Sequence, residues 1–368
     1  MSKSYCSLGL MSGTSADGVD ASVIQSNGDT EYKVILDKYF VYNQAIYENI
    51  HKLKEKINDS RDLTILSKEI QLLEKEITLF HTDVVKKIFK KSKLNIDLIG
   101  FHGQTIFHNA KEKISKQLGD GKLLSKLAKK TVIYDFRQND LKNGGQGAPL
   151  TPIFHKLLKI KFKIKNSTFI NIGGITNITS ISKEDKMSGT DVGPGMCLID
   201  RWIRQKSKKK YDKDGIISKS GKVNKKSLDQ LLENFNKKEK NLTRETVQSF
   251  DTKYFDFSLI ENLSLEDGAT TLMEFTAKLI MNALKSRRKL KDKLILCGGG
   301  RKNFFLVNRL KKENSNIQLI DQLGVDGDFI ESQAFGYLAI RSYLKLPISF
   351  PETTNVKKPC QGGVTIKY

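Results

Sequence analysis

Asp191 lies in a glycine-rich run, Gly-Thr-Asp-Val-Gly-Pro-Gly, at positions 189–195. Glycine lets the backbone approach a ligand closely and Pro194 restricts one φ angle, so we expect a stiff turn before a helix that begins near Met196. A single carboxylate in such a turn can act as a general base, as a metal ligand or as a helix cap. The residues around Asp191 leave these three roles open.

A second glycine-rich turn, with hydroxyls and carboxylates, lies near the N-terminus. Residues 8–11 and 19–24 are predicted strands, and Ser-Gly-Thr-Ser-Ala-Asp-Gly at 12–18 joins them as the tip of a β-hairpin. Backbone N–H groups and hydroxyls at such a tip suit phosphate oxygens, and Asp17 or Asp20 could hold magnesium-bound water. An ordinary polar hairpin loop has the same composition, so the loop alone does not distinguish a phosphate-binding tip from a structural turn.

Polar side chains follow a predicted strand at residues 96–101. His102 and Gln104 come directly after it, where open α/β sheets place their ligands, so these two side chains are candidates for ligand binding. His51 and His81 lie in predicted helices, where we expect them to be surface or packed residues. His108 and His155 remain unassigned.

A predicted strand at residues 131–136 also ends in polar residues. Arg137 and Asp140 follow it, before the glycine-rich loop at 143–149. An arginine beside carboxylates suits a polar ligand that carries a carboxylate and hydroxyls, and a structural salt bridge would use the same residue types.

A third glycine site lies late in the chain. A predicted strand at residues 293–296 leads through Cys297 into Gly298, Gly299 and Gly300, and Asn303 follows. A strand, three glycines and a helix form a place where a flat group or a phosphate can lie on the backbone. Further on, Glu331 opens a predicted helix that ends near residue 344.

The length and the repeated hairpins predict two α/β domains. The 368 residues are too many for one ordinary core. Residues 169–178 form a second predicted hairpin with a glycine turn, which suggests a duplicated domain with a cleft between the copies. We expect a first domain at 1–133 plus 346–368, and a second at 134–345.

The composition narrows the class of protein. The net charge of +22 invites a nucleic-acid hypothesis, but the lysines are spread along the chain and no nucleic-acid-binding motif accompanies them. This charge would still favour anionic ligands such as nucleotides. No apolar run approaches the length of a membrane span, no signal peptide is evident, and four scattered cysteines fit a reducing cytoplasm. We therefore expect neither nucleic acid nor a membrane as a partner.

Seven motifs, in one order along almost the whole chain, resemble those of the anhydro-N-acetylmuramic acid kinase family. They are Met-Ser-Gly-Thr-Ser-Ala-Asp-Gly-Val-Asp at 11–20, Gly-Phe-His-Gly-Gln-Thr at 100–105, Asp-Phe-Arg-Gln-Asn-Asp-Leu at 135–141, Gly-Gly-Gln-Gly-Ala-Pro-Leu at 144–150, Asn-Ile-Gly-Gly-Ile-Thr-Asn at 171–177, Asp-Val-Gly-Pro-Gly at 191–195 and Cys-Gly-Gly-Gly at 297–300.

The resemblance implies a fold and a reaction. The fold would be the two-domain, ribonuclease H-like α/β fold of actin, hexokinase and Hsp70, with an interdomain cleft that closes over ATP. The enzyme would open the 1,6-anhydro bridge of its amino sugar with water and transfer the γ-phosphate of ATP to O6. The product would be N-acetylmuramic acid 6-phosphate, in peptidoglycan recycling. A kinase of the same fold for another sugar, and a non-catalytic nucleotide-binding protein, are the alternatives.

The resemblance also implies roles for individual residues. Asp191 would be the catalytic base and Glu331 a second active-site carboxylate. Mg²⁺ would arrive with ATP, near Asp17, and a homodimer is compatible with these observations. The chain departs from the family pattern at Val192, where Thr is common, and at Met196, where Asn is common. The implied binding residues are Gly13, Thr14, Ser15, Ala16, Asp17, Gly18, Val19 and Asp20 for the ATP phosphates, Gly298, Gly299, Gly300 and Asn303 for adenosine, and His102, Gln104, Arg137 and Asp140 for the sugar.

Overall fold

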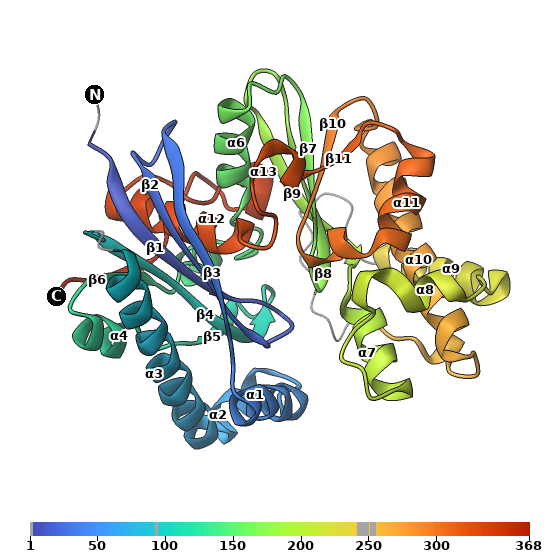
Figure 1. Cartoon of the computed structure of the whole chain (residues 1–368), viewed down its shortest axis with the longest axis horizontal. Helices are drawn as coiled ribbons and strands as arrows, with labels where there is room; N and C mark the ends of the chain where they lie inside the picture. Colours follow the sequence, from blue (N-terminus) through green and yellow to red (C-terminus); the bar gives the residue numbers. More distant parts are fainter. Residues whose placement is uncertain (1–2, 93–94, 241–249, 251–254) are drawn as a thin grey trace. The chain divides into compact units, whose positions relative to one another are not determined.

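A computed structural model describes residues 3–92, 95–240, 250 and 255–368 (Figure 1). The chain divides into two compact units, of which unit 1 is Met1–Lys163 with Asp328–Tyr368 and unit 2 is Ile164–Gly327. These boundaries differ from the predicted ones at 133/134 and 345/346. The C-terminal boundary differs because α12 (Ile330–Tyr343) packs against strands of unit 1. The other boundary differs because α6 (Pro152–Lys161) packs against α12 and so belongs to the same unit.

Unit 1 contains a seven-stranded sheet in the order β12-β6-β4-β1-β2-β3, with β5 paired to β4. The β1–β2 and β2–β3 pairs are antiparallel, whereas β1–β4 and β4–β6 are parallel. The strands are β1 (Tyr5–Ser12), β2 (Gly18–Ser26), β3 (Tyr32–Val41), β4 (Leu98–Asn109), β5 (Ile114–Leu118), β6 (Thr131–Tyr134) and β12 (Val364–Ile366).

Helices cover both faces of this sheet. Leu8 and Leu10 of β1 pack in one hydrophobic cluster with α1 and α3, while the intervening Gly9 faces α12. A Cβ atom on Gly9 would lie 1.9 Å from the carbonyl oxygen of Ser332, so only glycine lets α12 approach the sheet this closely. The unit's helices are α1 (Gln44–Lys56), α2 (Ser60–Ile65), α3 (Ser67–Ser92), α4 (Gly121–Ala128), α5 (Gln138–Lys142), α6 (Pro152–Lys161), α12 and α13 (Pro351–Thr354).

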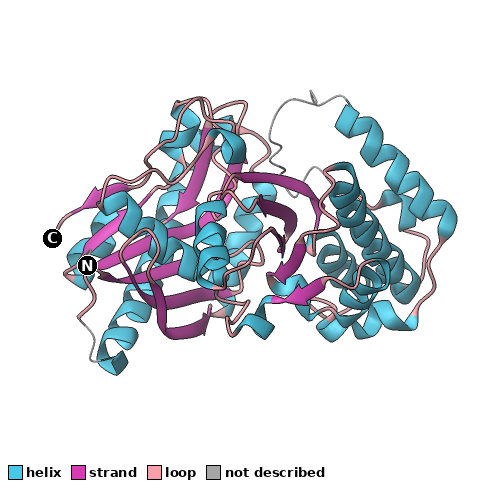
Figure 2. Ribbon diagram, turned by 90° about the horizontal axis from the view of Figure 1, so that it is seen from above, coloured by secondary structure: helices cyan, strands magenta, loops and turns pink. Residues whose placement is uncertain are grey.

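Unit 2 contains a five-stranded sheet in the order β11-β10-β7-β8-β9. One hydrophobic cluster joins its strands to helices α7, α10 and α11, and Figure 2 shows helices gathered along one side of these strands. The elements are β7 (Ser167–Ile172), β8 (Ile175–Ile181), β9 (Met187–Pro194), α7 (Cys197–Lys206), α8 (Ile216–Ser220), α9 (Lys225–Lys240), α10 (Leu265–Ser286), β10 (Lys293–Cys297), α11 (Phe304–Glu313) and β11 (Ile317–Leu319).

The two sheets share one topology. The path β3-β2-β1-β4-β6 in unit 1 corresponds to β9-β8-β7-β10-β11 in unit 2. In both units the first three strands form antiparallel pairs, and the first strand also pairs in parallel with the fourth. The predicted duplication of an α/β unit is confirmed, and this arrangement is the ribonuclease H-like fold of the actin, hexokinase and Hsp70 class.

The prediction for β4 was too short. The strand was expected to end at residue 101, but β4 continues to Asn109, so His102 and Gln104 lie within the strand and not beyond its end. The extension forms because β5 adds an antiparallel partner along residues 104–109, while parallel pairing with β1 runs as far as Gln104.

Two helix predictions in unit 1 had different outcomes. The helix expected at residues 43–57 is confirmed as α1, and the side chain of Asn43 caps it. The helix expected at 63–91 is divided into α2 and α3. The division occurs because Asp59 starts α2 with a capping box and Leu66 leaves helical geometry.

In the part of the chain that the structure describes, no helix is both long and apolar enough to cross a membrane. The four cysteines are free thiols, and Cys297 is fully buried.

Candidate functional site

Gln104 is bound to the tip of the β1–β2 hairpin in unit 1. Its Nε2 donates to the carbonyl oxygen of Gly13 over 3.1 Å. Ser12 Oγ lies 2.6 Å from Gln104 Oε1 and 2.9 Å from the carbonyl oxygen of Gly18. The structure therefore brings two predicted site segments together. Ser12 contributes to this arrangement, and the sequence prediction missed it because its type and spacing were those of a loop residue.

The hairpin tip itself is a compact turn with exposed polar side chains. Ala16 N–H donates to the carbonyl oxygen of Gly13, and Ser15 Oγ donates to Asp17 Oδ1 over 2.6 Å. Thr14, Ser15 and Asp17 are exposed. These hydroxyls and this carboxylate are available to a polar ligand.

Other predicted tip residues serve the fold. Ala16 and Val19 are buried in the hydrophobic cluster of unit 1, so only their backbone can face a ligand. A Cβ on Gly18 would lie 2.4 Å from the carbonyl oxygen of Phe40, which requires glycine there. Asp20 is half-buried and lies in β2, where it pairs with Met11 of β1 and with Tyr39 of β3.

His102 and Arg137 form a second pair in unit 1. Arg137 donates to His102 Nε2 from Nη2 over 3.0 Å and from Nε over 3.3 Å. His102 Nδ1 lies 2.9 Å from the carbonyl oxygen of Gly103, and its ring packs on Phe335. Burial, together with the neighbouring guanidinium, holds the pKa of His102 well below its usual value. The imidazole is therefore neutral and accepts from Arg137.

Asp140 is a buried carboxylate that organises the adjoining glycine loop. Its Oδ2 accepts from Gly147 N–H and its Oδ1 from Thr354 Oγ1, each over 2.7 Å. Gly147 in turn offers its carbonyl oxygen to Arg137 Nη1, also at 2.7 Å. Asp140 thus acts on Arg137 through the loop and does not form the direct salt bridge that was considered.

Glu331 is the second residue of α12 and is half-buried. The residues after it fix the start of this helix to the sheet: Ser332 Oγ lies 2.6 Å from Ser22 Oγ, and Gln333 Nε2 donates to Asp37 Oδ2 over 2.9 Å. The place of Glu331 is therefore set by a polar network that joins α12 to β2 and β3.

Asp191 lies in strand β9 of unit 2, and the expectation of a turn at this residue was wrong. Pairing with β8 keeps the chain extended to Pro194 despite the glycines. The helix expected near Met196 is confirmed as α7, but Met196 is its N-cap and no side chain caps it. The capping hypothesis for Asp191 is therefore wrong. Asp191 is 7% exposed, and its Oδ2 accepts from Phe250 N–H over 2.8 Å.

The second hairpin meets the end of β9. Gly195 N–H donates to the carbonyl oxygen of Gly174 over 2.9 Å, and Met196 N–H to that of Gly173 over 2.8 Å. Val192 is buried in the unit 2 cluster and Met196 packs against it. The two departures from the family pattern thus add apolar contacts beside Asp191.

The glycine turn after β10 lies against the end of β7. Gly298 has a φ of +79°, and a Cβ there would lie 2.7 Å from the carbonyl oxygen of Ile172, so both conformation and space require glycine. Around Gly299, in contrast, a Cβ would meet nothing within 4 Å. Asn303 is buried and caps α11 by accepting from Leu306 N–H over 3.0 Å. The turn is thus closely packed at Gly298, while the space beside Gly299 is open.

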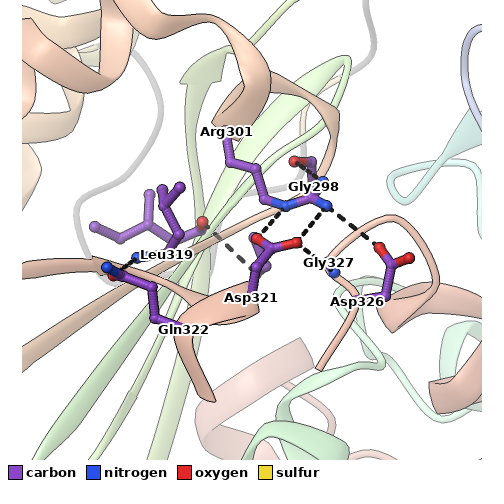
Figure 3. Close-up of polar contacts among 9 residues, drawn as sticks. Gly298, Arg301, Leu319, Asp321, Gln322, Asp326 and Gly327 are labelled. Atoms are coloured by element: carbon purple, nitrogen blue, oxygen red, sulfur yellow. Dashed lines mark hydrogen bonds and ion pairs between the residues drawn. The ribbon is translucent and has the colours of Figure 1, made fainter. Parts of the chain in front are cut away.

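Arg301 is a buried arginine beside this turn that the sequence prediction did not include (Figure 3). Its guanidinium contacts Asp321, Asp326 and the carbonyl oxygen of Gly298. The arginine beside it holds the pKa of Asp321 below its usual value. The only signal in the sequence was an arginine directly after three glycines.

Among the described residues, no group of three or more histidine, cysteine, aspartate or glutamate side chains is arranged to hold a metal ion. The exposed carboxylate at the hairpin tip is that of Asp17.

Two units of one ribonuclease H-like topology, one with a hydroxyl-bearing hairpin tip and the other with a buried aspartate and a glycine turn, place the chain in the actin, hexokinase and Hsp70 fold class. The family model described as anhydro-N-acetylmuramic acid kinase matches residues 5–367. The chain therefore belongs to the anhydro-N-acetylmuramic acid kinase family.

Individual relatives agree with the family model. The chain is 52% identical over 377 residues to the anhydro-N-acetylmuramic acid kinase of Pelagibacter ubique (strain HTCC1062), with 100% of both chains covered. It is 33% identical to that of Agrobacterium fabrum (strain C58 / ATCC 33970), with 98% of each covered. Among solved structures, it resembles the activator of the 2-hydroxyisocaproyl-CoA dehydratase from Clostridium difficile, at a TM-score of 0.44 and 12% identity, covering 92% of this chain and 96% of that one.

Proposed function

We propose that this kinase opens 1,6-anhydro-N-acetylmuramic acid with water and phosphorylates O6 with ATP. Water attacks C1 and loses a proton to the enzyme, while the bond from C1 to O6 breaks. O6 then bonds to the γ-phosphorus as the bond from that phosphorus to the bridging oxygen of ADP breaks. The products are N-acetylmuramic acid 6-phosphate and ADP, as expected in peptidoglycan recycling.

The observation that carries this proposal is the environment of Asp191. A base that activates water needs a carboxylate that is held in one orientation and shielded from bulk solvent. Asp191 is 7% exposed, lies in a paired strand, and has one oxygen bound by Phe250 N–H. The hydrogen bond fixes the orientation of the carboxylate group that is proposed to accept the proton from water.

Residues of unit 1 are proposed to bind the sugar. Arg137 is half-buried, positively charged and oriented by His102 and by the carbonyl oxygen of Gly147, which suits it to the lactyl carboxylate. Asp140 fixes the loop that supports Arg137. Glu331, near the start of α12, is proposed as a second active-site carboxylate.

ATP is proposed to use the two glycine turns. The tip at residues 13–20 would face the phosphates with its hydroxyls and backbone N–H groups, and residues 298–300 with Asn303 would border the adenosine. Mg²⁺ prefers one or two carboxylates together with phosphates and water, and the exposed Asp17 beside two hydroxyls fits this donor set. When bound, the ion would neutralise charge on the phosphates.

The proposed location is a reducing cytoplasm, and a homodimer is compatible with the proposal. Support for the location comes from the four free cysteines. Burial raises the pKa of the Cys197 thiol to about 12, which keeps that side chain protonated and unreactive.

The direct test is product analysis after incubation of purified protein with the anhydro sugar and Mg-ATP in ¹⁸O-water. Hydrolytic opening places the label on C1, read promptly before anomeric exchange, and the phosphate on O6. Phosphorylation without label at C1 would instead indicate a kinase of the same fold that does not open a ring. Binding of ATP without any turnover would indicate a nucleotide-binding protein.

A further inference from the structure

Arg301 lies directly after the glycine turn of unit 2, and only 4% of its side chain is exposed (Figure 3). The guanidinium is oriented by two loop carboxylates. Nε and Nη2 donate to the two oxygens of Asp321 over 2.7 and 2.8 Å, and Nη2 also lies 3.4 Å from Asp326 Oδ1. A bidentate pair of this kind fixes the plane of the guanidinium as well as its position.

The remaining arm of Arg301 holds the glycine turn. Its Nη1 donates to the carbonyl oxygen of Gly298 over 3.1 Å, and its own backbone N–H donates to the same oxygen over 3.2 Å. In a trans peptide the carbonyl and the next N–H point in opposite directions, so these two bonds also fix the direction of Gly299 N–H. Space is open at Gly299, where a Cβ would meet nothing within 4 Å.

The loop after β11 is built around this arginine. Gly327 N–H lies 3.4 Å from Asp321 Oδ1, and a Cβ on Gly327 would lie 2.3 Å from Arg301 Nε. The absence of a side chain at Gly327 therefore lets the loop pass over the guanidinium. Arg301 joins two segments that are separate in sequence, the turn after β10 and the loop that follows β11.

We propose that Arg301 is a positioning residue for the nucleotide: it holds the Gly298–Gly299 peptide in the orientation that ATP binds, and Asp321 holds Arg301 in the conformation that does so. The role rests on the proposed function, which places adenosine at this turn. Arg301 acts through the backbone of the turn, so its removal impairs nucleotide binding more than sugar binding or the chemical step.

Steady-state kinetics with both substrates varied test this role. Because a hydrogen bond from a charged group is lost, Arg301→Met should raise the KM for ATP by about tenfold or more and change the KM for the sugar by less than about twofold. Arg301→Lys keeps the charge but reaches one acceptor at a time, so its KM for ATP should fall between those of wild type and Arg301→Met. Asp321→Asn should shift the KM for ATP in the same direction as Arg301→Met.

A matched control separates positioning from general stability. Arg341 of unit 1 is also a buried arginine that donates to backbone carbonyl oxygens, those of Gly28 and Pro347, and it contacts no predicted site residue in these bonds. Arg341→Met should lower the melting temperature while leaving the KM for ATP unchanged. If Arg301 only stabilised the fold, Arg301→Met would likewise lower the melting temperature and leave the KM for ATP unchanged.

Calorimetric binding of ADP completes the test without any turnover. Wild type should bind ADP, and Arg301→Met should bind it about tenfold more weakly or worse. If wild type binds no nucleotide, the proposed function fails, whatever Arg301 does. If wild type binds ADP and the variant binds it equally well, the positioning role is refuted while the proposed function stands. If Arg301→Met does not fold, Arg301→Lys and Asp321→Asn decide by the same two measurements.

Discussion

Arg137 fixes the tautomer of His102. A guanidinium has no acceptor, so the 3.0 Å contact between Arg137 Nη2 and His102 Nε2 must be a donation to an unprotonated ring nitrogen. The proton of the neutral ring is then on Nδ1, from which it is donated to the carbonyl oxygen of Gly103 over 2.9 Å. A protonated His102 would instead place two donors against each other in a buried position.

The first prediction follows from this pair. In nitrogen-15 spectra, His102 should remain the neutral Nδ1–H tautomer from about pH 5.5 to about pH 8, because burial and Arg137 hold its pKa well below the usual value. Arg137→Met should raise the pKa of His102 only in part, since burial is the larger cause. A ring that titrates near its ordinary pKa in wild type, or that carries its proton on Nε2, would contradict the assignment.

The second prediction concerns the proposed base. Asp191→Asn keeps the shape and can still accept from Phe250 N–H, but it cannot take a proton from water, so turnover should fall by about 10³-fold or more. The affinity for ATP, measured by calorimetry, should stay within about twofold because the amide adds no bulk.

The control for Asp191 is on the same hairpin. Glu184 lies in the exposed turn between β8 and β9, and Glu184→Gln removes a carboxylate from that hairpin without touching a proposed site residue. Its turnover should equal that of wild type. Turnover of Asp191→Asn within a few-fold of wild type would show that another group activates the water.

The sequence predicted the backbone structure of these segments better where local residue preferences determine it than where strand pairing does. The tip of the first hairpin was predictable because the glycines and the polar residues between two apolar runs determine such a turn locally. The strand around Asp191 was not. Glycine and proline favour a turn there, and the ladder with β8 overrides that preference.

Long-range partners explain the other differences. The length of β4 depends on its pairing with β5. Because β5 is only five residues long and follows a turn, its sequence has no periodic pattern from which the strand could be predicted. Arg301 was missed for a similar reason, because Asp321 and Asp326 are 20 and 25 residues away in the chain. Their meeting depends on the parallel pairing of β10 with β11, which composition does not reveal.

The third prediction concerns the support of Arg137. Thr354→Val keeps the shape of the side chain but removes the hydroxyl that donates to Asp140 Oδ1, and leaves a buried carboxylate oxygen without that bond. The free energy of unfolding, measured by denaturant titration, should fall by about 1–3 kcal/mol. The KM for the sugar should rise as well, because Asp140 orients Gly147 and Gly147 binds Arg137.

Thr354→Ser is the matched control for that bond. It keeps the hydroxyl and loses only a methyl group, so most of the stability and the KM for the sugar should be retained. Equal losses of stability in the two variants would assign the effect to packing and not to the hydrogen bond with Asp140.

The fourth prediction concerns acid stability and rests on buried neutral histidines. Burial lowers the pKa of His81 to about 4 and that of His155 to about 3, against 6.5 for the free side chain. At a pH between the folded-state pKa and 6.5, each histidine is protonated in the unfolded chain and neutral in the folded chain. The stabilisation is therefore complete above about pH 6.5 and is lost as the pH falls. His81 and His155 should each lower the free energy of unfolding by about 2 kcal/mol as the pH falls from 7 to 5.

His81→Phe isolates one of these contributions. The ring packs between Tyr42 and Phe101 and makes one hydrogen bond, from Nδ1 to the carbonyl oxygen of Ile77, so an aromatic ring without a proton site can replace it. The loss of unfolding free energy between pH 7 and pH 5 should shrink by about 2 kcal/mol. All five histidines lie in unit 1, so hydrogen exchange at pH 5 should speed up in β4 before it does so in β7 of unit 2. An unchanged pH dependence in His81→Phe, or faster exchange in β7 first, would assign acid sensitivity to carboxylates instead.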